Sequence, residues 1–351
     1  MYLLHGNHMS AKKNIQLNIA IVGLGTIAKQ AHLPTLIATA TNIKQIIDPN
    51  PDIAAIVRSL PGQIDYSQSI EEILPSINVA LVTSPSALHY TQVGALLTKG
   101  LHVFCEKPLS LTTTQAKKLA NLARQKSLTL QVGYYRRFHE SSHLVQQLLK
   151  SGELGALISC KIVAGSCETS STLPPSMFIK DLCGGGVLMD FGVHVVDRLY
   201  SWFDQLILQE YFDDEKGGLE ANCLINILGI NGKCKSKVSI SLSRTCELGY
   251  YSLLKFEKGW IKIMHNEGNI IYFSLSTNKL LAKAAPLFPY IISQNKSHLN
   301  YFRLQWDEFV NRINGGIEIL SSLDDSIRTT SFIELCYKQK QILNLPWETL
   351  I

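Results

Sequence analysis

The 351-residue sequence lacks the features that mark secreted, membrane-spanning and metal-dependent proteins. Its eight cysteines are scattered without a C-x-x-C pair, which argues against a zinc site and a disulfide framework. No apolar run approaches the length of a membrane span. The opening segment has a short apolar stretch with its charge on the wrong side for a signal peptide, and Met9 is an alternative start. We therefore expect a cytoplasmic protein with reduced thiols, no metal and no membrane association.

Dense charge of either sign is also absent. Charged residues make up 17% of the chain and hydrophobic residues 46%, as in an ordinary globular protein. The net charge of +5 comes from 33 basic and 28 acidic residues, and the basic residues form no run. This balance suits an anionic ligand and argues against nucleic acid as a partner. The length suits two domains.

The first third of the chain alternates short apolar segments with helix-like segments. Strands are predicted at Asn18–Val22, Lys44–Ile47, Val79–Thr83, His102–Cys105 and Thr129–Val132. Continuous apolar strands are typical of a parallel sheet that is buried on both faces. Helix signals lie between them: Asn50 before Pro51, a capping box at Ser69 and Glu72, and a stop at Gly100. We predict a doubly wound α/β domain over residues 1–133.

The pattern of apolar and polar residues changes after Gly133. One helix-like stretch covers residues 141–155, and apolar or alternating runs follow at 156–165, 221–230, 236–245, 251–265 and 269–276. Alternation with turn residues between the runs predicts a large, mostly antiparallel sheet. The tail, Tyr301–Leu343, has a helical pattern. We therefore predict an α+β second domain over residues 134–351.

The hexapeptide Gly23-Leu24-Gly25-Thr26-Ile27-Ala28 follows the first strand and opens a helix. It is interpreted either as a phosphate cradle or as an ordinary strand–turn–helix corner. In a cradle, Gly23 permits the tight turn, Gly25 lets the backbone approach a pyrophosphate, and Ala28 allows close packing. Asp48 ends the next strand, where a carboxylate binds ribose hydroxyls and repels a 2′-phosphate. We predict NAD as cofactor, with NADP as the alternative.

Two further strand ends belong to the same predicted cleft, because parallel sheets bind ligands at the carboxyl ends of their strands. They are Val82–His89 and Phe104–Ser110. Cofactor contacts are predicted for Thr83, Ser84, Pro85, His89, Glu106 and Lys107, besides Gly23, Gly25, Thr26, Ile27, Ala28 and Asp48. In the alternative interpretation, Pro85 and Pro108 are turn residues and Lys107 is a surface lysine.

The segment Asp181–Phe203 contains three successive glycines followed by a helical pattern. Its apolar stripe is formed by Leu188, Phe191, Val195, Leu199 and Trp202. Asp190 and His194 stand four residues apart, so they are expected to project together, and such a pair suits proton transfer. Two alternatives stay open: a solvent-facing helix with an incidental contact, and a metal site for which further ligands are missing.

Taken together, these motifs resemble the glucose–fructose oxidoreductase / inositol dehydrogenase / MocA (Gfo/Idh/MocA) family. The resemblance rests on the glycine turn with AHLP downstream, TSPSALH, EKPLS, YYRRFH and GGGVLMDFGVH, in family order. It implies a Rossmann domain followed by a domain with a large open sheet that is often used for oligomer contacts. It also implies that Lys107 touches cofactor and substrate, and that Asp190 and His194 line the substrate pocket.

The implied function is an NAD(P)-dependent oxidoreductase that transfers a hydride to or from a sugar, polyol or nucleotide sugar. Either His194 or Lys107 is the base, and Asp190 orients the pair. Arg136, at the domain junction, is a further cofactor-binding candidate, although an arginine there either meets an anionic group or forms a structural ion pair. Ser166–Asp181 is expected to form a substrate loop, and a homodimer or homotetramer is expected through the C-terminal sheet. The alternatives are a non-catalytic sensor and a reductase of aromatic or imine substrates.

Overall fold

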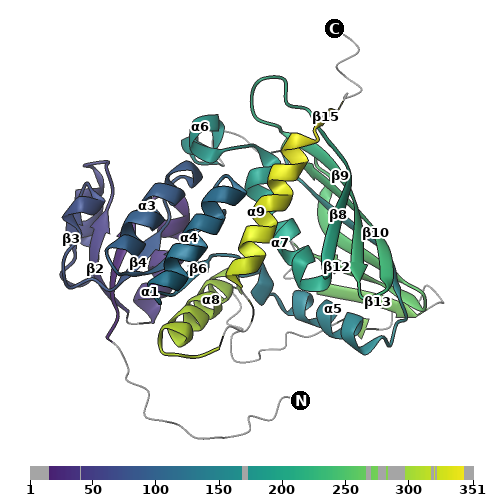
Figure 1. The fold of residues 1–351 in the computed structure, drawn as a ribbon, viewed down its shortest axis with the longest axis horizontal. Helices are drawn as coiled ribbons and strands as arrows, with labels where there is room; N and C mark the ends of the chain where they lie inside the picture. The colour runs from purple at the N-terminus through teal and green to yellow at the C-terminus, as the bar shows by residue number, and fades with distance from the viewer. Residues whose placement is uncertain are drawn as a thin grey trace, which may run out of the picture.

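Two domains, each built on its own sheet, lie beside one another in the computed structural model (Figure 1). The structure describes residues 16–39, 41–167, 173–265, 270–275, 282–283, 297–317, 320 and 322–343. The opening segment, with its alternative start at Met9, and residues 168–172 of the predicted substrate loop lie outside the described residues.

The first domain contains a six-stranded parallel sheet with the strand order β3-β2-β1-β4-β5-β6. The strands are β1 (Asn18–Val22), β2 (Asn42–Ile47), β3 (Asp65–Ser67), β4 (Val79–Val82), β5 (His102–Cys105) and β6 (Leu130–Val132). All of β4 is buried, as expected for an apolar strand covered on both faces. The predicted doubly wound parallel sheet is confirmed. The prediction missed β3, because its Asp-Tyr-Ser sequence contains no apolar run.

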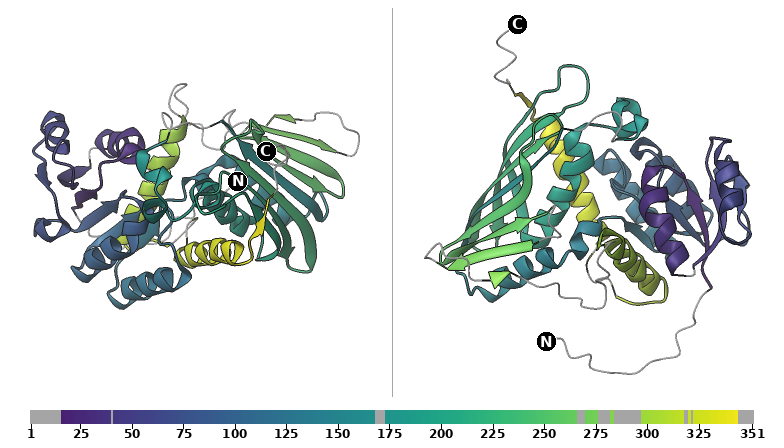
Figure 2. Two further views of the ribbon diagram at one scale, coloured as in Figure 1. Left: turned by 90° about the horizontal axis from the view of Figure 1, so that it is seen from above. Right: turned by 180° about the vertical axis from the view of Figure 1, so that it is seen from behind.

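Helices cover both faces of this sheet (Figure 2). They are η1 (Ala28–His32) continuing into α1 (Leu33–Ala38), α2 (Ile53–Ser59), η2 (Ile70–Glu72), α3 (Ser86–Thr98) and α4 (Thr113–Gln125). The stop at Gly100 is confirmed by its left-handed φ of 87°. The helix predicted from Pro51 begins two residues later, at Ile53. The Ser69 hydroxyl caps η2 through the Glu71 N–H, so the predicted pairing with Glu72 is wrong.

The second domain contains a nine-stranded sheet with the order β14-β13-β12-β11-β7-β10-β9-β8-β15. The strands are β7 (Leu157–Gly165), β8 (Gln205–Asp213), β9 (Asn222–Asn231), β10 (Cys234–Ser243), β11 (Gly249–Phe256), β12 (Gly259–Met264), β13 (Ile270–Leu275), β14 (Ala282–Lys283) and β15 (Gln341–Ile342). Only the β7–β10 and β8–β15 pairs in the described part of the sheet are parallel, so the predicted antiparallel character is confirmed. The prediction missed β8.

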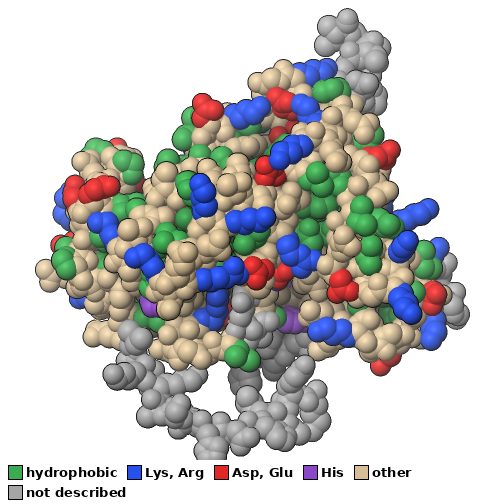
Figure 3. Space-filling model, in the orientation of Figure 1, with side chains coloured by type: hydrophobic (Ala, Val, Ile, Leu, Met, Phe, Trp, Pro, Cys, Tyr) green, Lys and Arg blue, Asp and Glu red, His purple; other side chains and the backbone are tan. Residues whose placement is uncertain are grey.

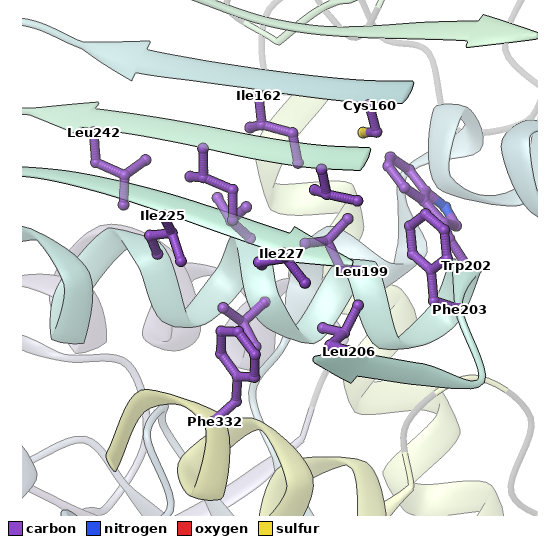
Figure 4. Packing of buried hydrophobic residues seen from close by; sticks show 14 of the residues in the cluster. Cys160, Ile162, Leu199, Trp202, Phe203, Leu206, Ile225, Ile227, Leu242 and Phe332 are labelled. Carbon is purple, nitrogen blue, oxygen red and sulfur yellow. The ribbon is translucent and has the colours of Figure 1, made fainter. Parts of the chain in front are cut away.

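One face of this sheet is covered by helices (Figure 1). The second half of the chain contains η3 (Tyr135–Phe138), α5 (Glu140–Ser151), η4 (Pro175–Phe178), α6 (Lys180–Cys183), η5 (Leu188–Gly192), α7 (Val193–Trp202), α8 (Ser297–Ile313) and α9 (Leu323–Lys338). Helix α7 lies between the sheet and α9, with Leu199, Trp202 and Phe332 in the core between them (Figure 4). The predicted apolar stripe is buried here, except that Phe191 is half-buried.

Helix α8 connects the C-terminal part of the chain to the first domain. Trp306, Phe309 and Ile313 join the core formed with β1, and the Phe309 ring packs edge-on against Phe104 of β5 with centroids 5.5 Å apart. The two sheets divide near residue 133, but the first domain's core is completed from the far end of the sequence. The relative placement of the two domains therefore depends on apolar burial by α8.

We expect Phe309→Ala to lower the free energy of unfolding by about 3–5 kcal/mol, because a fully buried ring would leave a cavity. Urea denaturation would measure the loss. The matched control is Ile317→Ala, whose side chain is 80% exposed and whose removal should cost less than about 0.5 kcal/mol. Similar small losses in both variants would show that α8 contributes little to the first core.

Candidate active site

A cavity of about 760 Å³ opens at the carboxyl ends of β1, β4 and β5 and extends to η5 and α7 of the second domain. Among the predicted site residues, it is lined by Gly23, Gly25, Thr26, Ile27, Asp48, Thr83, Ser84, Pro85, Glu106, Lys107, Asp190 and His194. Ala28, His89 and Arg136 are not lining residues. Nucleotide-side and proton-transfer candidates from distant parts of the sequence thus meet in one space.

The glycine turn has room for a diphosphate. Gly23 has a φ of 90°, and a Cβ atom there would lie 2.8 Å from the Ser84 nitrogen, so the turn requires glycine. A Cβ atom on Gly25 would meet protein only at 4.0 Å, at the Thr83 carbonyl oxygen, so the backbone here faces open cavity. The helix begins directly after the turn and offers N–H donors to an anion. The Asp48 carboxylate accepts a hydrogen bond from the Leu24 N–H at 2.7 Å, which fixes it beside the turn.

Hydrogen bonds of the buried Glu106 side chain hold the strand end that carries Lys107. The His32 Nε2 atom lies 2.7 Å from a Glu106 carboxylate oxygen, and the other oxygen accepts the Lys107 N–H at 3.1 Å. Burial raises the pKa of Glu106, but His32 and Lys107 lower it to a net value below its ordinary range. The His89 ring nitrogens lie 2.6 Å and 2.9 Å from the carbonyl oxygens of Pro108 and Ser84. His89 thus joins two cavity loops without lining the cavity.

Lys107 and Asp190 form an ion pair between the domains. The Lys107 Nζ atom donates to the Asp190 Oδ1 atom at 2.7 Å and to the Asp190 carbonyl oxygen at 2.8 Å. The second carboxylate oxygen accepts a bond from Arg244 at 2.8 Å. Burial would raise the pKa of Asp190, but the two cations outweigh it and hold that pKa below its ordinary value. Asp190 is therefore an ionised acceptor at neutral pH.

His194 is buried next to this group, with its ring 5.3 Å from the Tyr135 ring. Burial lowers its pKa well below 6.5, and the positive charges of Lys107 and Arg136 lower it further. Its Nδ1 atom has no hydrogen-bond partner in the described part of the chain. No hydrogen bond joins Asp190 to His194 among the described residues, because Asp190 lies in the wider π-helical turn η5 and faces Lys107. Of the two candidate bases, Lys107 and His194, Asp190 therefore forms a hydrogen bond to Lys107 only, among the described residues.

The two arginines at the domain junction have different surroundings. Arg137 is buried and pairs with Asp197 at 2.8 Å and with Asp325 at 2.9 Å, so it forms the structural ion pair. The guanidinium of Arg136 lies 4.2 Å from the centre of the Phe191 ring and donates to the Tyr250 hydroxyl. Arg136 thus packs among aromatic rings, one of which, Tyr135, lines the cavity, while Arg136 itself is not a lining residue.

Residues 17–134 match the oxidoreductase family with an NAD-binding Rossmann fold. The model that these residues of the first domain match is that of the Gfo/Idh/MocA family. The match covers the domain that carries the glycine turn, Asp48 and Lys107, and the Rossmann fold predicted from the sequence is confirmed.

Two curated relatives match about a third and about a half of the chain. The chain is 41% identical over 123 residues to the putative oxidoreductase YceM of Salmonella typhimurium, covering 35% of this chain and 40% of that protein. It is 26% identical over 186 residues to the scyllo-inositol 2-dehydrogenase (NAD(+)) of Bacillus subtilis, covering 52% of each. The chain thus spans about half, or less, of the length of these relatives.

A solved structure shares the complete fold. The aldose-aldose oxidoreductase from Caulobacter crescentus, complexed with glycerol, superposes with a TM-score of 0.77 at 19% identity, covering 93% of this chain and 97% of that one. At this identity the likeness concerns the fold, in which a Rossmann domain precedes a large open sheet.

Several residues in or beside the cavity were not predicted from the sequence as site residues. Tyr135, Met177 and Phe302 line the cavity, and Arg244 lies behind Asp190. Tyr135 belongs to the quoted YYRRFH motif and Met177 to the predicted substrate loop, but neither was predicted as a site residue. Phe302 and Arg244 come from the predicted tail and a predicted strand run. No local pattern marks them, because each reaches the site through a long-range contact.

Membrane-spanning helices and metal-binding clusters are both absent from the described residues. No helix in the part of the chain that the structure describes is long and apolar enough to cross a membrane. The same residues include no cluster of His, Cys, Asp and Glu able to hold a metal ion. All eight cysteines are free thiols.

The low pKa of His194 predicts a pH dependence of stability. The folded state keeps the ring neutral, whereas the unfolded chain binds a proton near pH 6.5, so the unfolding free energy falls as pH drops below that value. The contribution is at most about 1.4 kcal/mol per pH unit. His194→Gln lacks this proton, and its stability should therefore decline less steeply in urea titrations between roughly pH 7.5 and pH 5. Parallel slopes for the two proteins would contradict a depressed pKa.

Proposed function

We propose that this protein is an NAD-dependent dehydrogenase or reductase acting on a hydroxyl or carbonyl carbon of a sugar, polyol or nucleotide sugar. The observation that carries the proposal is the convergence of the glycine turn, Lys107, Asp190 and His194 on one cavity. The names of similar proteins support it, since they include a scyllo-inositol 2-dehydrogenase and an aldose-aldose oxidoreductase. The presence of the whole Lys–Asp–His group favours catalysis over a sensor role.

The bound nicotinamide supplies the hydride chemistry. Lys107 uses two of the three donors of its ammonium on Asp190, and the third is directed to the substrate oxygen, where it stabilises developing negative charge. His194 lines the cavity and its ring is neutral, so it is the proton acceptor for the substrate hydroxyl. Asp190 acts on Lys107 and keeps its amine in place.

The cavity lining supports NAD as the cofactor. Asp48 and Glu71 stand on the nucleotide side, and Lys107 is the sole lysine or arginine among the described residues that line the cavity. A 2′-phosphate near Asp48 would thus meet carboxylates without a cationic partner. The turn and Asp48 would hold the adenosine end of the cofactor, and Glu106 with its His32 partner supports the strand end that carries Lys107.

The remaining features support a cytoplasmic homo-oligomer. Reduced cysteines are typical of an intracellular compartment, and eight free thiols agree with it. The sheet face opposite α5, α7 and α9 exposes Ile158 (45%) and Leu224 (39%), apolar positions that suit a contact with a second copy. On the face shown in Figure 3, lysine and arginine side chains are dispersed among acidic ones, which argues against a nucleic-acid partner.

Turnover is the direct test of the proposed activity. Free sugars, polyols and nucleotide sugars would be screened by the absorbance of NADH in both directions. Lys107→Ala should lower kcat by at least about a thousandfold, because it removes the donor to the reacting oxygen, while NAD affinity changes only a few-fold. Lys117→Ala, on α4 outside the cavity lining, is the matched control and should keep wild-type turnover. Unchanged turnover in Lys107→Ala would remove it from the mechanism.

The assignment of Asp48 makes a separate prediction about the cofactor. Asp48→Ala should weaken NAD binding by about tenfold and reduce the preference over NADP, since it removes the ribose acceptor and the repulsion of a 2′-phosphate. Calorimetry with both cofactors measures the ratio. Asp65→Ala, at the exposed start of β3, is the control. If the wild-type protein prefers NADP, the role of Asp48 is wrong.

A further inference from the structure

Asp190 lies between two cations that come from different domains. Lys107 follows β5 and takes the Oδ1 atom at 2.7 Å, and Arg244 follows β10 and takes the Oδ2 atom at 2.8 Å. Arg244 is itself only 9% exposed and is not a lining residue of the cavity. Arg244 therefore acts on the site through the Asp190 carboxylate and not by contact with the cavity.

The backbone that carries Arg244 is fixed by a network of short hydrogen bonds. The Arg244 N–H donates to the Ala221 carbonyl oxygen at 2.9 Å. On either side, the hydroxyls of Ser243 and Thr245 donate to the Asn222 side-chain oxygen at 2.5 Å and 3.0 Å. The Asn222 amide in turn donates to Asp214 at 2.6 Å. The guanidinium therefore starts from an ordered turn between β10 and β11.

We propose that Arg244 is a positioning residue of the active site, which fixes the Asp190 carboxylate and through it the amine of Lys107. This inference rests on the proposed function for its catalytic meaning, but its charge contact stands by itself. Two oxygens held from opposite sides leave the carboxylate one orientation. Without Arg244, Lys107 alone among the described residues holds the Asp190 carboxylate, which can then turn about its terminal bond. The Lys107 amine keeps its bond to the Asp190 carbonyl oxygen but is held less firmly in its direction toward the substrate.

Arg244 also helps to keep the Asp190 carboxylate ionised. A carboxylate in a buried place tends to take up a proton, and each nearby cation opposes this. With Arg244 present, the pair with Lys107 remains ionised when the pH falls. Arg244 removal should therefore shift the acid limb of the pH profile of kcat to higher pH, which a purely structural residue would not do.

The decisive variants are Arg244→Gln, which removes the charge, and Arg244→Lys, which keeps it. Arg124→Gln is the matched control, because Arg124 also pairs with a carboxylate, that of Asp324 at 2.6 Å, but on the surface. The first readout is the Asp190 titration midpoint, followed by carbon NMR of the labelled carboxyl group in protein without substrate. Thermal unfolding of each variant shows whether it folds.

We expect Arg244→Gln to raise the Asp190 midpoint by about one pH unit or more, and the other two variants to leave it near the wild-type value. Once a substrate is found, Arg244→Gln should lower kcat about 10- to 100-fold with little change in the KM for NAD, and Arg244→Lys should recover part of the loss. A folded Arg244→Gln protein with an unchanged midpoint overturns the inference. A shifted midpoint in a protein that turns over no substrate contradicts the proposed function and leaves the charge contact intact.

Discussion

The ion pair between Lys107 and Asp190 is the contact on which the arrangement of the site depends. Lys107 belongs to the end of a parallel strand, and Asp190 to a π-helical turn of the other domain. Their two hydrogen bonds join the two domains within the cavity lining. Packing between helices of the two domains places this pair. Helix α8 completes the first core from the C-terminal part of the chain, and α9 packs against both α4 and α7. Apolar burial thus brings the charges within reach of one another.

The cavity is electrostatically divided. Its nucleotide side carries Asp48 and Glu71, which suit neutral hydroxyl donors, while its other end carries Lys107 with one shared counter-ion. His194 stays neutral there, since burial and neighbouring cations both oppose its protonation. A site of this kind favours negative charge on a substrate oxygen and offers an uncharged acceptor for its proton. Under the proposed function, the same division would separate cofactor binding from chemistry in space.

The cofactor side of the site was largely predictable, because its residues follow from local rules. A strand, a glycine turn and a helix in succession place Gly23 and Gly25, and the end of the next parallel strand places Asp48 beside them. The chemistry side was less predictable. Asp190 and His194 are four residues apart, but a π-helical turn aims Asp190 at Lys107, and Arg244 joins them from 54 residues away. Helical periodicity alone contains neither the wider turn nor the distant partner.

The sequence by itself determined the parallel sheet, the antiparallel sheet and the glycine corner, because apolar periodicity and glycine geometry act between near neighbours in the chain. It also distinguished the residue types able to move a proton. Tertiary structure alone decided that Arg137 forms a structural ion pair, that His89 lies behind the cavity wall and that Phe302 lines it. These outcomes depend on which surfaces are buried together when the two domains pack, and that is a property of long-range contacts rather than of any short segment.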